Sequence, residues 1–142
     1  MNRFIIGMIS TGAILLGGSH TSRAGDLEIK IDGIRREEGT VRVALFASED
    51  DYKADRAYAQ EETPAEDPMV TVRFQDVPPG RYCIASFQDI NSNGKIDTNF
   101  VGIPKEPYGF SRNARGRFGP PAFNEMAFDV GPEEEQLEIT LE

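Results

Sequence analysis

Four oxygen-bearing side chains stand at nearby positions in one short stretch of the chain. Asp89, Asn91, Asn93 and Asp97 have the spacing found at the start of a calcium-binding loop, D-x-N-x-N-G-x-x-D. Gly94 stands where the backbone of such a loop turns sharply. Because this spacing points the side chains toward one centre, it predicts that they converge on a single cation.

The loop is incomplete as a calcium site. Its twelfth position, which carries a bidentate Glu in helix–loop–helix calcium proteins, is Phe100. Together with the backbone carbonyl of Lys95, the loop offers about five ligands where calcium takes about six to eight, and we expect water, Asn99 or Glu106 to supply the rest. Two carboxylates predict weak binding, in the sub-millimolar to millimolar range. The alternative is an Asx-turn loop, in which Asn and Asp side chains accept backbone hydrogen bonds and no metal binds.

The residue types elsewhere exclude several catalytic mechanisms. His20 is the single histidine of the chain, and it lies in an N-terminal segment that we expect to be removed. A Ser-His-Asp triad, a Cys-His pair and a His-ligated zinc site would therefore lack a residue that they need. The single cysteine, Cys83, lies in an apolar run and is predicted to be a small buried hydrophobe. Carboxylate chemistry remains open, as in a glycoside hydrolase that uses two of Asp89, Asp97 and Glu106.

A second group of candidate binding residues lies in the long connection from residue 100 to residue 125. Its basic side chains, Arg112, Arg115 and Arg117, are suited to receive a carboxylate or a phosphate. Tyr108 and Phe110 are the neighbouring aromatic residues. The alternatives are that the arginines pair with surplus acidic side chains and that the aromatic rings only pack the loop.

The first 24 residues have the pattern of a secretory signal peptide. Arg3 precedes an apolar run over residues 4–18, and Ser22-x-Ala24 is a small-x-small cleavage signal. The run is shorter than the roughly 20 residues that span a bilayer comfortably. We therefore expect cleavage after Ala24, a mature chain without a membrane span, and a periplasmic or secreted location. The alternative is an uncleaved anchor.

The charge of the chain limits its partners. The formal net charge is −9, and it becomes two units more negative when Arg3 and Arg23 leave with the signal peptide. A chain this acidic is expected to repel nucleic acid and anionic membrane surfaces. It is compatible with cation binding.

Alternating apolar residues predict one all-β domain over residues 25–142. The expected strands with one apolar face lie near residues 27–31, 41–46, 70–74, 126–130 and 137–141. A further strand, from residue 81 to about residue 88, is apolar on both faces and is expected in the interior, where it delivers Asp89 from its end. With room for a short seventh strand and two long loops, the pattern is typical of an antiparallel β-sandwich. The predicted core residues are Leu27, Ile29, Val41, Val43, Val72, Phe74, Ile84, Phe87, Phe128, Ile139 and Leu141.

The connections between these strands give three local predictions. The first two strands are expected to form a hairpin. The acidic connection over residues 47–68 is expected to hold a short helix near residues 49–60, followed by a mobile loop. Pro79 and Gly80 are expected to form a turn, with Gly80 in the positive-φ position.

Five sequence blocks occur in a specific order along the mature chain. They are F-x-D-x-P-x-G-x-Y from residue 74, the D-x-N-x-N-G-K-x-D loop, G-I-P-K-E from residue 102, Y-G-F-S from residue 108 and P-x-F from residue 121. Their order resembles a bacterial family known as domain of unknown function 2141. The resemblance implies an exported β-sandwich, similar to transthyretin-like, carboxypeptidase-regulatory-like or immunoglobulin-like folds, without an established activity. The chain departs from the family at Cys83, where a small residue is common, and in an acidic insertion between Phe46 and Met69.

These features predict an exported, non-enzymatic binding or accessory module whose partner is a protein or glycan of the envelope. Its binding surface is expected on the two long loops and the calcium-like turn. Two alternatives remain: a carboxylate-based hydrolase acting on glycans, and a structural envelope protein.

Overall fold

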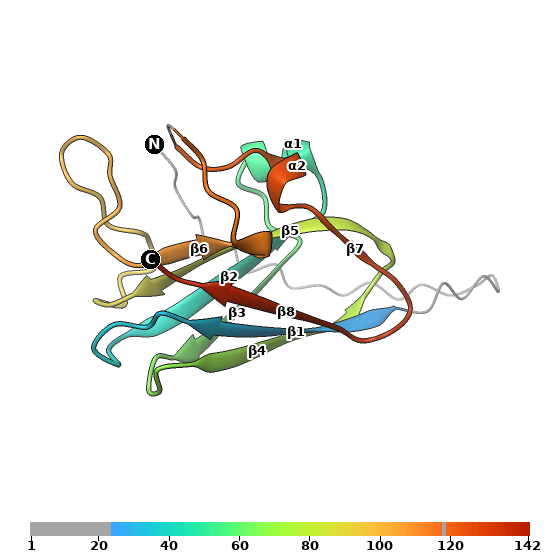
Figure 1. The fold of residues 1–142 in the computed structure, drawn as a ribbon, viewed down its shortest axis with the longest axis horizontal. Coiled ribbons are helices and arrows are strands. Elements are labelled where there is room, and N and C mark those ends of the chain that lie inside the picture. Colours follow the sequence, from blue (N-terminus) through green and yellow to red (C-terminus); the bar gives the residue numbers. More distant parts are fainter. Residues whose placement is uncertain (1–23, 118) are drawn as a thin grey trace.

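The protein forms a two-sheet β-sandwich in the computed structural model, which describes residues 24–117 and 119–142 (Figure 1). One sheet has three strands in the order β4–β1–β8, and the other has the order β3–β2–β5–β6, with β7 also paired to β5. The element bounds are β1 Gly25–Asp32, β2 Thr40–Phe46, α1 Glu49–Lys53, β3 Ala59–Pro64, β4 Val70–Val77, β5 Gly80–Asp89, β6 Tyr108–Phe110, α2 Phe123–Met126, β7 Phe128–Val130 and β8 Glu135–Thr140. The predicted all-β sandwich is confirmed.

The predicted signal peptide lies outside the described residues except for Ala24. Within the described part of the chain, no helix is both long and apolar enough to cross a membrane.

The core between the sheets follows the alternation of apolar residues. In β1, Leu27, Ile29 and Ile31 are fully buried, while the residues between them are partly exposed. Of the predicted core residues, ten are buried and Phe128 is half-buried. Phe87 is buried on the opposite face of its sheet, outside the main core cluster. The period of two therefore predicted buried positions correctly, although the buried core also includes residues outside this list, such as Leu45, Phe46 and Met126.

The predicted hairpin between the first two strands is wrong, because β1 and β2 lie in different sheets. Instead β1 pairs with β4 antiparallel and with β8 parallel, so the sandwich is not purely antiparallel. The connection between β1 and β2 crosses from one sheet to the other and is held by the buried side chain of Gln88. Its Oε1 accepts a hydrogen bond from the N–H of Arg35 at 2.7 Å, and its Nε2 donates to the carbonyls of Arg35 and Glu38.

The predicted helix over residues 49–60 is also wrong in extent. The helix α1 ends at Lys53. Its N-terminus is capped by the Ser48 hydroxyl, which accepts a hydrogen bond from Asp51 N at 3.1 Å. Residues 59–64 form β3, which pairs antiparallel with β2 along its length. Because β3 is an edge strand whose side chains are mostly exposed, it lacks the alternating apolar pattern that would have predicted it. With β3 and the short β6, the described chain has eight strands.

The expected positive φ at Gly80 is not observed. Gly80 is the first residue of β5, and the left-handed backbone lies earlier, at Asp76, with φ of 54°. The register of the β1–β4 pair shifts opposite this point, between Gly25 and Leu27. The connection to β5 is then closed by the Tyr82 hydroxyl, which donates to the Pro78 carbonyl at 2.6 Å.

A smaller apolar cluster lies on the outer face of the five-stranded sheet, under α1 and α2. Phe46 and Cys83 lie side by side in β2 and β5, and Phe123 and Met126 of α2 pack against them. Cys83 is fully buried, and its burial raises the pKa of the thiol to about 12. The prediction that Cys83 is a small buried hydrophobe is confirmed.

Candidate functional site

The strand β5 ends by placing Asp89 inside the protein. This carboxylate has no exposed surface, and three hydrogen bonds converge on it. Its Oδ1 accepts from Asn93 N at 3.1 Å, and its Oδ2 accepts from Gly94 N and from Arg42 Nε, each at 2.8 Å. A buried carboxylate needs partners of this kind because its desolvation is costly. Asp89 therefore organises the loop that follows it.

The rest of the loop forms a chain of local hydrogen bonds. Asn91 Oδ1 accepts from Asn93 N, and Asn93 Oδ1 accepts from Lys95 N. The side-chain amides of both asparagines donate to the carboxylate of Asp97, at 2.6 and 2.9 Å. The hydrogen bond from Asn93 is the largest influence on the pKa of Asp97 and lowers it. Burial acts in the opposite direction, and the hydrogen bond from Asn91 lowers the pKa further, so that it lies below its usual value. This is the hydrogen-bonding pattern of an Asx-turn loop.

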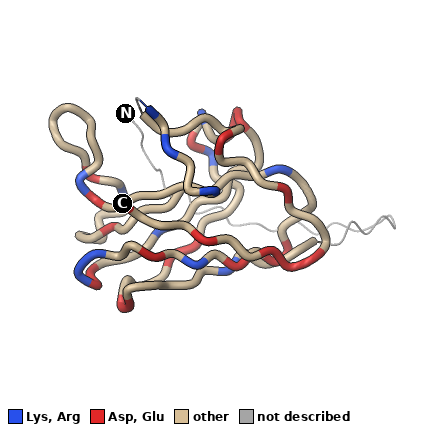
Figure 2. Tube along the Cα trace, viewed as in Figure 1, with Lys and Arg blue, Asp and Glu red and all other residues tan. Residues whose placement is uncertain are grey.

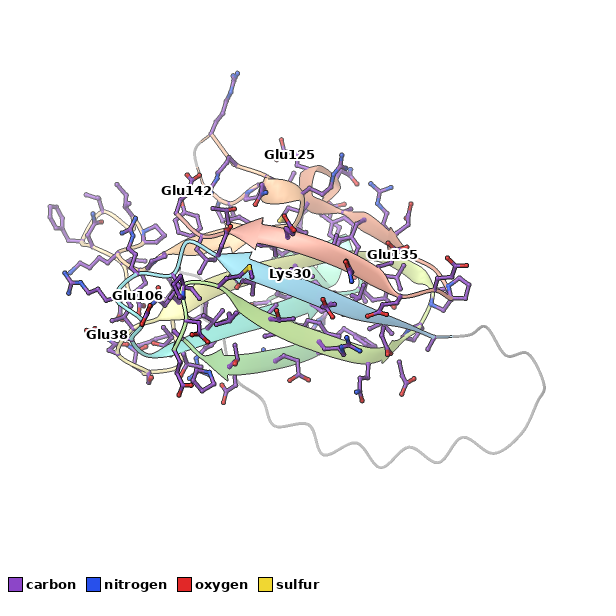
Figure 3. All side chains as sticks on the ribbon, turned by 60° about the horizontal axis from the view of Figure 1, so that its bottom comes forward. Lys30, Glu38, Glu106, Glu125, Glu135 and Glu142 are labelled. Carbon is purple, nitrogen blue, oxygen red and sulfur yellow. The ribbon has the colours of Figure 1, made fainter. Side chains whose placement is uncertain are left out.

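Glu106 binds the backbone at both ends of the loop. It is buried, and its two carboxylate oxygens accept from Ile90 N at 2.6 Å and from Asp97 N at 2.8 Å. Burial raises the pKa of Glu106, and the two backbone hydrogen bonds oppose that shift. Figure 3 places Glu106 at the same end of the molecule as Glu38. The role of Glu106 in this arrangement is to hold the backbone of the loop.

The oxygens predicted to bind calcium keep some unused acceptor capacity. Two oxygens of a carboxylate offer about four lone pairs, of which Asp89 uses three and Asp97 uses two. Asn91 and Asn93 each use one lone pair of the amide oxygen. Asn99 differs, because its Oδ1 already accepts from two backbone N–H groups further along the chain. Among the described residues there is no cluster of three or more His, Cys, Asp or Glu side chains arranged for a metal.

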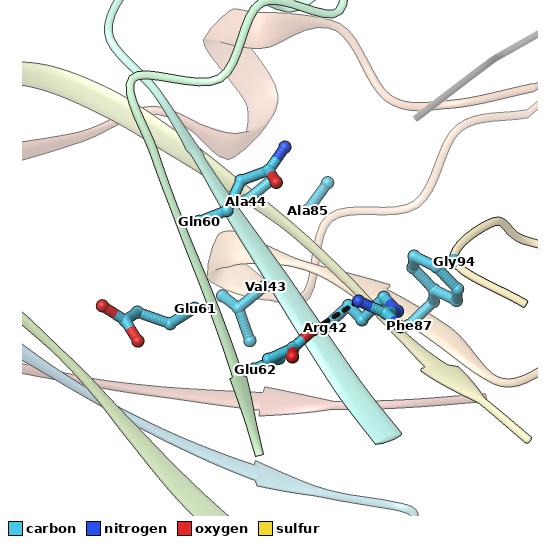
Figure 4. A pocket seen from close by; sticks show the side chains of 9 residues that line it. All are labelled: Arg42, Val43, Ala44, Gln60, Glu61, Glu62, Ala85, Phe87 and Gly94. Atoms are coloured by element: carbon cyan, nitrogen blue, oxygen red, sulfur yellow. Dashed lines mark hydrogen bonds and ion pairs between the residues drawn. The ribbon is translucent and has the colours of Figure 1, made fainter. Parts of the chain in front are cut away.

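A cleft of about 250 Å³ lies beside this loop on the outer face of the five-stranded sheet. Its floor is formed by Ala44, Ala85 and Phe87, where β2 pairs with β5 (Figure 4). Arg42 lies across its rim and forms ion pairs with Glu62 of β3 and with the buried carboxylate at the start of the loop. The lining residues are Arg42, Val43, Ala44, Gln60, Glu61, Glu62, Ala85, Phe87 and Gly94.

The three arginines of the predicted basic cluster have different surroundings. Arg115 pairs with Glu142 at 3.1 Å and lies 6.0 Å from the ring centre of Tyr108. The guanidinium of Arg112 reaches the Ala127 carbonyl at 3.5 Å, and Arg117 is exposed. The rings of Tyr108 and Phe110 contact each other edge to face, with 5.9 Å between their centres. Pairing with an acidic side chain is therefore observed for Arg115, and the aromatic pair packs on β6.

Comparison with protein families matches residues 29–138 to a family described as an uncharacterised protein conserved in bacteria, DUF2141. The chain belongs to this family. No curated protein and no solved structure matched it in the other two comparisons.

The sequence blocks of this DUF2141 protein gather around β5. The first block joins β4 to β5, and the loop block follows β5 directly. The Y-G-F-S block forms β6 and ends at Ser111, which is fully buried. The Ser111 hydroxyl accepts from Ile84 N at 3.0 Å and donates to the Met126 carbonyl at 2.7 Å, so it ties this block to β5 and α2.

Sequence reasoning missed the residues of β2 and β3 that border the cleft. Arg42 is the main omission, since it links the loop carboxylate to Glu62. Its position between Val41 and Val43 indicated only an outward-facing side chain. Gln60 and Glu62 were missed because β3 itself was not predicted. No local signal in the sequence pairs Arg42 with Asp89, which lies 47 residues away.

Proposed function

We propose that this DUF2141 protein is an exported, non-enzymatic binding module that holds part of a protein or glycan partner of the envelope in the cleft between β2, β3 and β5. The cleft is the observation that carries this proposal. Its apolar floor is bordered by a guanidinium, a carboxylate and an amide, from Arg42, Glu62 and Gln60. Ligand sites commonly combine an apolar lining with a few polar groups that fix orientation. Export rests on the N-terminal signal pattern.

The state of the carboxylates supports binding over hydrolysis. A glycosidase needs an acid and a second carboxylate that both reach the substrate. Asp89 is fully buried, and Glu106 is nearly so, with both of its oxygens bound to backbone N–H groups. A substrate would have to displace these hydrogen bonds before either group could act on it. A transthyretin-like fold of the sandwich is part of the proposal, on the family resemblance alone.

The loop after β5 gives the proposal a second part, the binding of calcium. We infer a weak site formed by Asp89, Asn91, Asn93, Asp97 and the Lys95 carbonyl, with water completing the shell. The unused lone pairs described above support it. The guanidinium of Arg42 on Asp89 Oδ2 opposes it, because it already neutralises one of the two carboxylates. The ion would stiffen one wall of the cleft, since Gly94 contributes to the cleft lining.

A variant that fills the cleft tests the first part of the proposal. Gln60 is exposed on β3 and borders the cleft, so Gln60→Trp places a bulky ring over the floor. Gln75→Trp, on the exposed face of β4 in the other sheet, is the matched control. The immobilised proteins are presented with a panel of soluble glycans and with envelope extract. We expect a ligand retained by the wild type and by Gln75→Trp and released by Gln60→Trp.

The same measurements separate the alternatives. Release of shortened products from a glycan would support the hydrolase, and its loss in Asp97→Ala would assign the chemistry to the loop. A protein that retains no ligand and turns over no glycan would contradict the binding module and support a structural envelope protein. If both tryptophan variants retained the ligand equally, the binding surface would lie outside the cleft, which would contradict this part of the proposal.

A further inference from the structure

Beyond the loop after β5, residues 97–105 of the connection to β6 extend from the end of the sandwich as a finger (Figure 1). The tip of this finger is apolar. Phe100 is fully exposed, and Val101 and Ile103 are exposed to 62% and 59%. Only two other large hydrophobic side chains in the described chain are exposed to a comparable degree, Tyr58 and Met69. Three such residues within four positions make a contiguous apolar surface, which in soluble proteins commonly marks an interaction site.

The two sides of the finger are hydrogen-bonded to each other as a short two-stranded ribbon, and this ribbon fixes the position of the apolar tip. Lys105 N donates to Asp97 O at 2.8 Å, and Asn99 N donates to Ile103 O at 2.9 Å, so the two sides pair in register. Thr98 and Pro104 form a β-bridge between them. Below the ribbon, the buried carboxylate of Glu106 fixes the base to the sandwich. The tip is therefore presented without a large entropic cost of ordering on contact.

Four of the five backbone N–H groups over residues 99–103 are bonded within the finger. Asn99 Oδ1 accepts from Val101 N and Ile103 N, each at 3.0 Å, and Asn99 O accepts from Gly102 N at 3.0 Å. The N–H of Asn99 is bound within the ribbon, as described above. Burying a backbone N–H in an apolar medium is costly unless it has such a partner. These internal bonds lower the cost of moving the tip out of water.

Along the connection between β5 and β6, the exposed charged side chains are positive. Residues 98–104 carry no charge and are uniformly tan in Figure 2. Over residues 90–107 the exposed charged side chains are Lys95 and Lys105, while Asp97 is partly buried and Glu106 is buried. Lysine combines a long aliphatic stem with a charged head, so it suits the boundary between apolar chains and phosphate groups.

We propose that the finger inserts its tip, Phe100, Val101 and Ile103, into the interfacial region of a phospholipid bilayer that contains anionic lipid, with Lys95 and Lys105 at the headgroups. A narrow convex wedge with an aromatic residue at its apex is suited to a fluid interface, and the apolar area of such a wedge supplies the binding free energy. The negative charge of the whole chain opposes approach, but at physiological salt it is screened beyond about 8 Å, while the two lysines lie next to the surface. This surface is separate from the ligand cleft, whose lining includes none of these five residues.

Vesicle flotation with the mature chain tests this proposal. The vesicles are phosphatidylcholine with and without a minor fraction of phosphatidylglycerol, at physiological salt with a chelator present, so that calcium plays no part. We expect the wild type to float with the vesicles that contain phosphatidylglycerol. Phe100→Asp should lower the partition coefficient by at least about tenfold, because it removes the largest apolar group and adds a charge. The double variant Lys95→Glu, Lys105→Glu should lose the preference for phosphatidylglycerol.

Met69→Asp is the matched control, because Met69 is exposed to 53% on another part of the molecule. It should float like the wild type, and thermal melts should show that all variants are folded. A wild type that stays with the protein fraction for both vesicle types overturns the proposal. Equal flotation of Phe100→Asp and wild type also overturns it, as does a vesicle-free dimer that Phe100→Asp dissociates without any flotation of the wild type. That last outcome would make the finger a contact between two copies of the chain.

Discussion

At the scale of single residues, one buried carboxylate decides the conformation of the candidate site. Asp89 accepts hydrogen bonds from two backbone N–H groups of the loop and from Arg42 on the neighbouring strand. Arg42 in turn pairs with Glu62 on β3. These interactions connect the loop, β2 and β3 through one charged group, so its loss should be felt well beyond the loop.

Replacing Asp89 should therefore destabilise the whole domain. Asp89→Ala removes the acceptor of Gly94 N and one of the two acceptors of both Arg42 and Asn93 N, and we expect the free energy of unfolding to fall by about 3 kcal/mol. Chemical denaturation followed by circular dichroism measures this change. The exposed Asp67 provides the control, since Asp67→Ala should change stability by no more than about 0.5 kcal/mol. A variant at position 89 as stable as the wild type would contradict the structural role of this carboxylate.

Burial makes the thiol of Cys83 unreactive in the folded protein. It has no exposed surface, and its pKa is raised to about 12, so the thiolate is scarce at neutral pH. We predict that a disulfide-exchange reagent leaves the folded protein unlabelled at neutral pH and modifies one thiol after addition of denaturant. Labelling that is fast in native buffer and unaffected by denaturant would mean that Cys83 is accessible in the folded protein.

At the scale of elements, the loop after β5 and the finger form one continuous unit. Asp97 accepts side-chain hydrogen bonds within the loop, and its backbone carbonyl accepts from Lys105 in the finger. Glu106 then ties the unit to the end of β5 through the N–H of Ile90. An ion bound by the loop would therefore stabilise the base of the finger as well.

The calcium site is tested on this element through Asp97. Calcium at ten times its dissociation constant should add about 1.4 kcal/mol of stability, which raises the melting temperature by about 5 °C for a domain of this size. Magnesium should do less, because it requires tighter octahedral geometry and gives up water reluctantly. Asp97→Ala should abolish the increment. It is a better test than Asp89→Ala, because Asp97 is not part of the buried core.

Thermal melts of the wild type and of Asp67→Ala serve as the reference for this experiment, since both should respond equally to calcium. If the wild type shows no shift and no calorimetric heat at millimolar calcium, the loop is an Asx-turn structure that needs no ion.

At the scale of the whole molecule, the candidate ion-binding loop and the finger lie at one end of the sandwich, and the cleft lies on the outer face of one sheet. The loop, the finger and the connection between β1 and β2 lie at the same end of the strands (Figure 1). The cleft occupies the part of the outer sheet face that α1 and α2 leave open. A module that lies on a bilayer by its finger and binds a partner in its cleft would act at an envelope surface.

Export is the prediction that belongs to this scale. The intact mass of the protein recovered from the periplasm or the medium should correspond to a chain that begins at Gly25, because cleavage is expected after Ala24. Replacing the small residue at the cleavage site, as in Ala24→Lys, should leave the precursor uncut. A native species that keeps Met1, or one that extracts with the inner membrane, would contradict export by this signal.

The sequence by itself determined the strands with an apolar face, the burial of β5 and the hydrogen-bonded loop at its end. These features are local, because a period of two sets which side chains are buried, and the Asp and Asn spacing sets the turns. Only the tertiary structure decided which strands pair. The separation of β1 from β2, the parallel β1–β8 pair and the edge strand β3 depend on hydrogen bonds between distant segments. The cleft and the Arg42–Asp89 ion pair exist for the same reason, since sheet register brings residues far apart in the chain side by side.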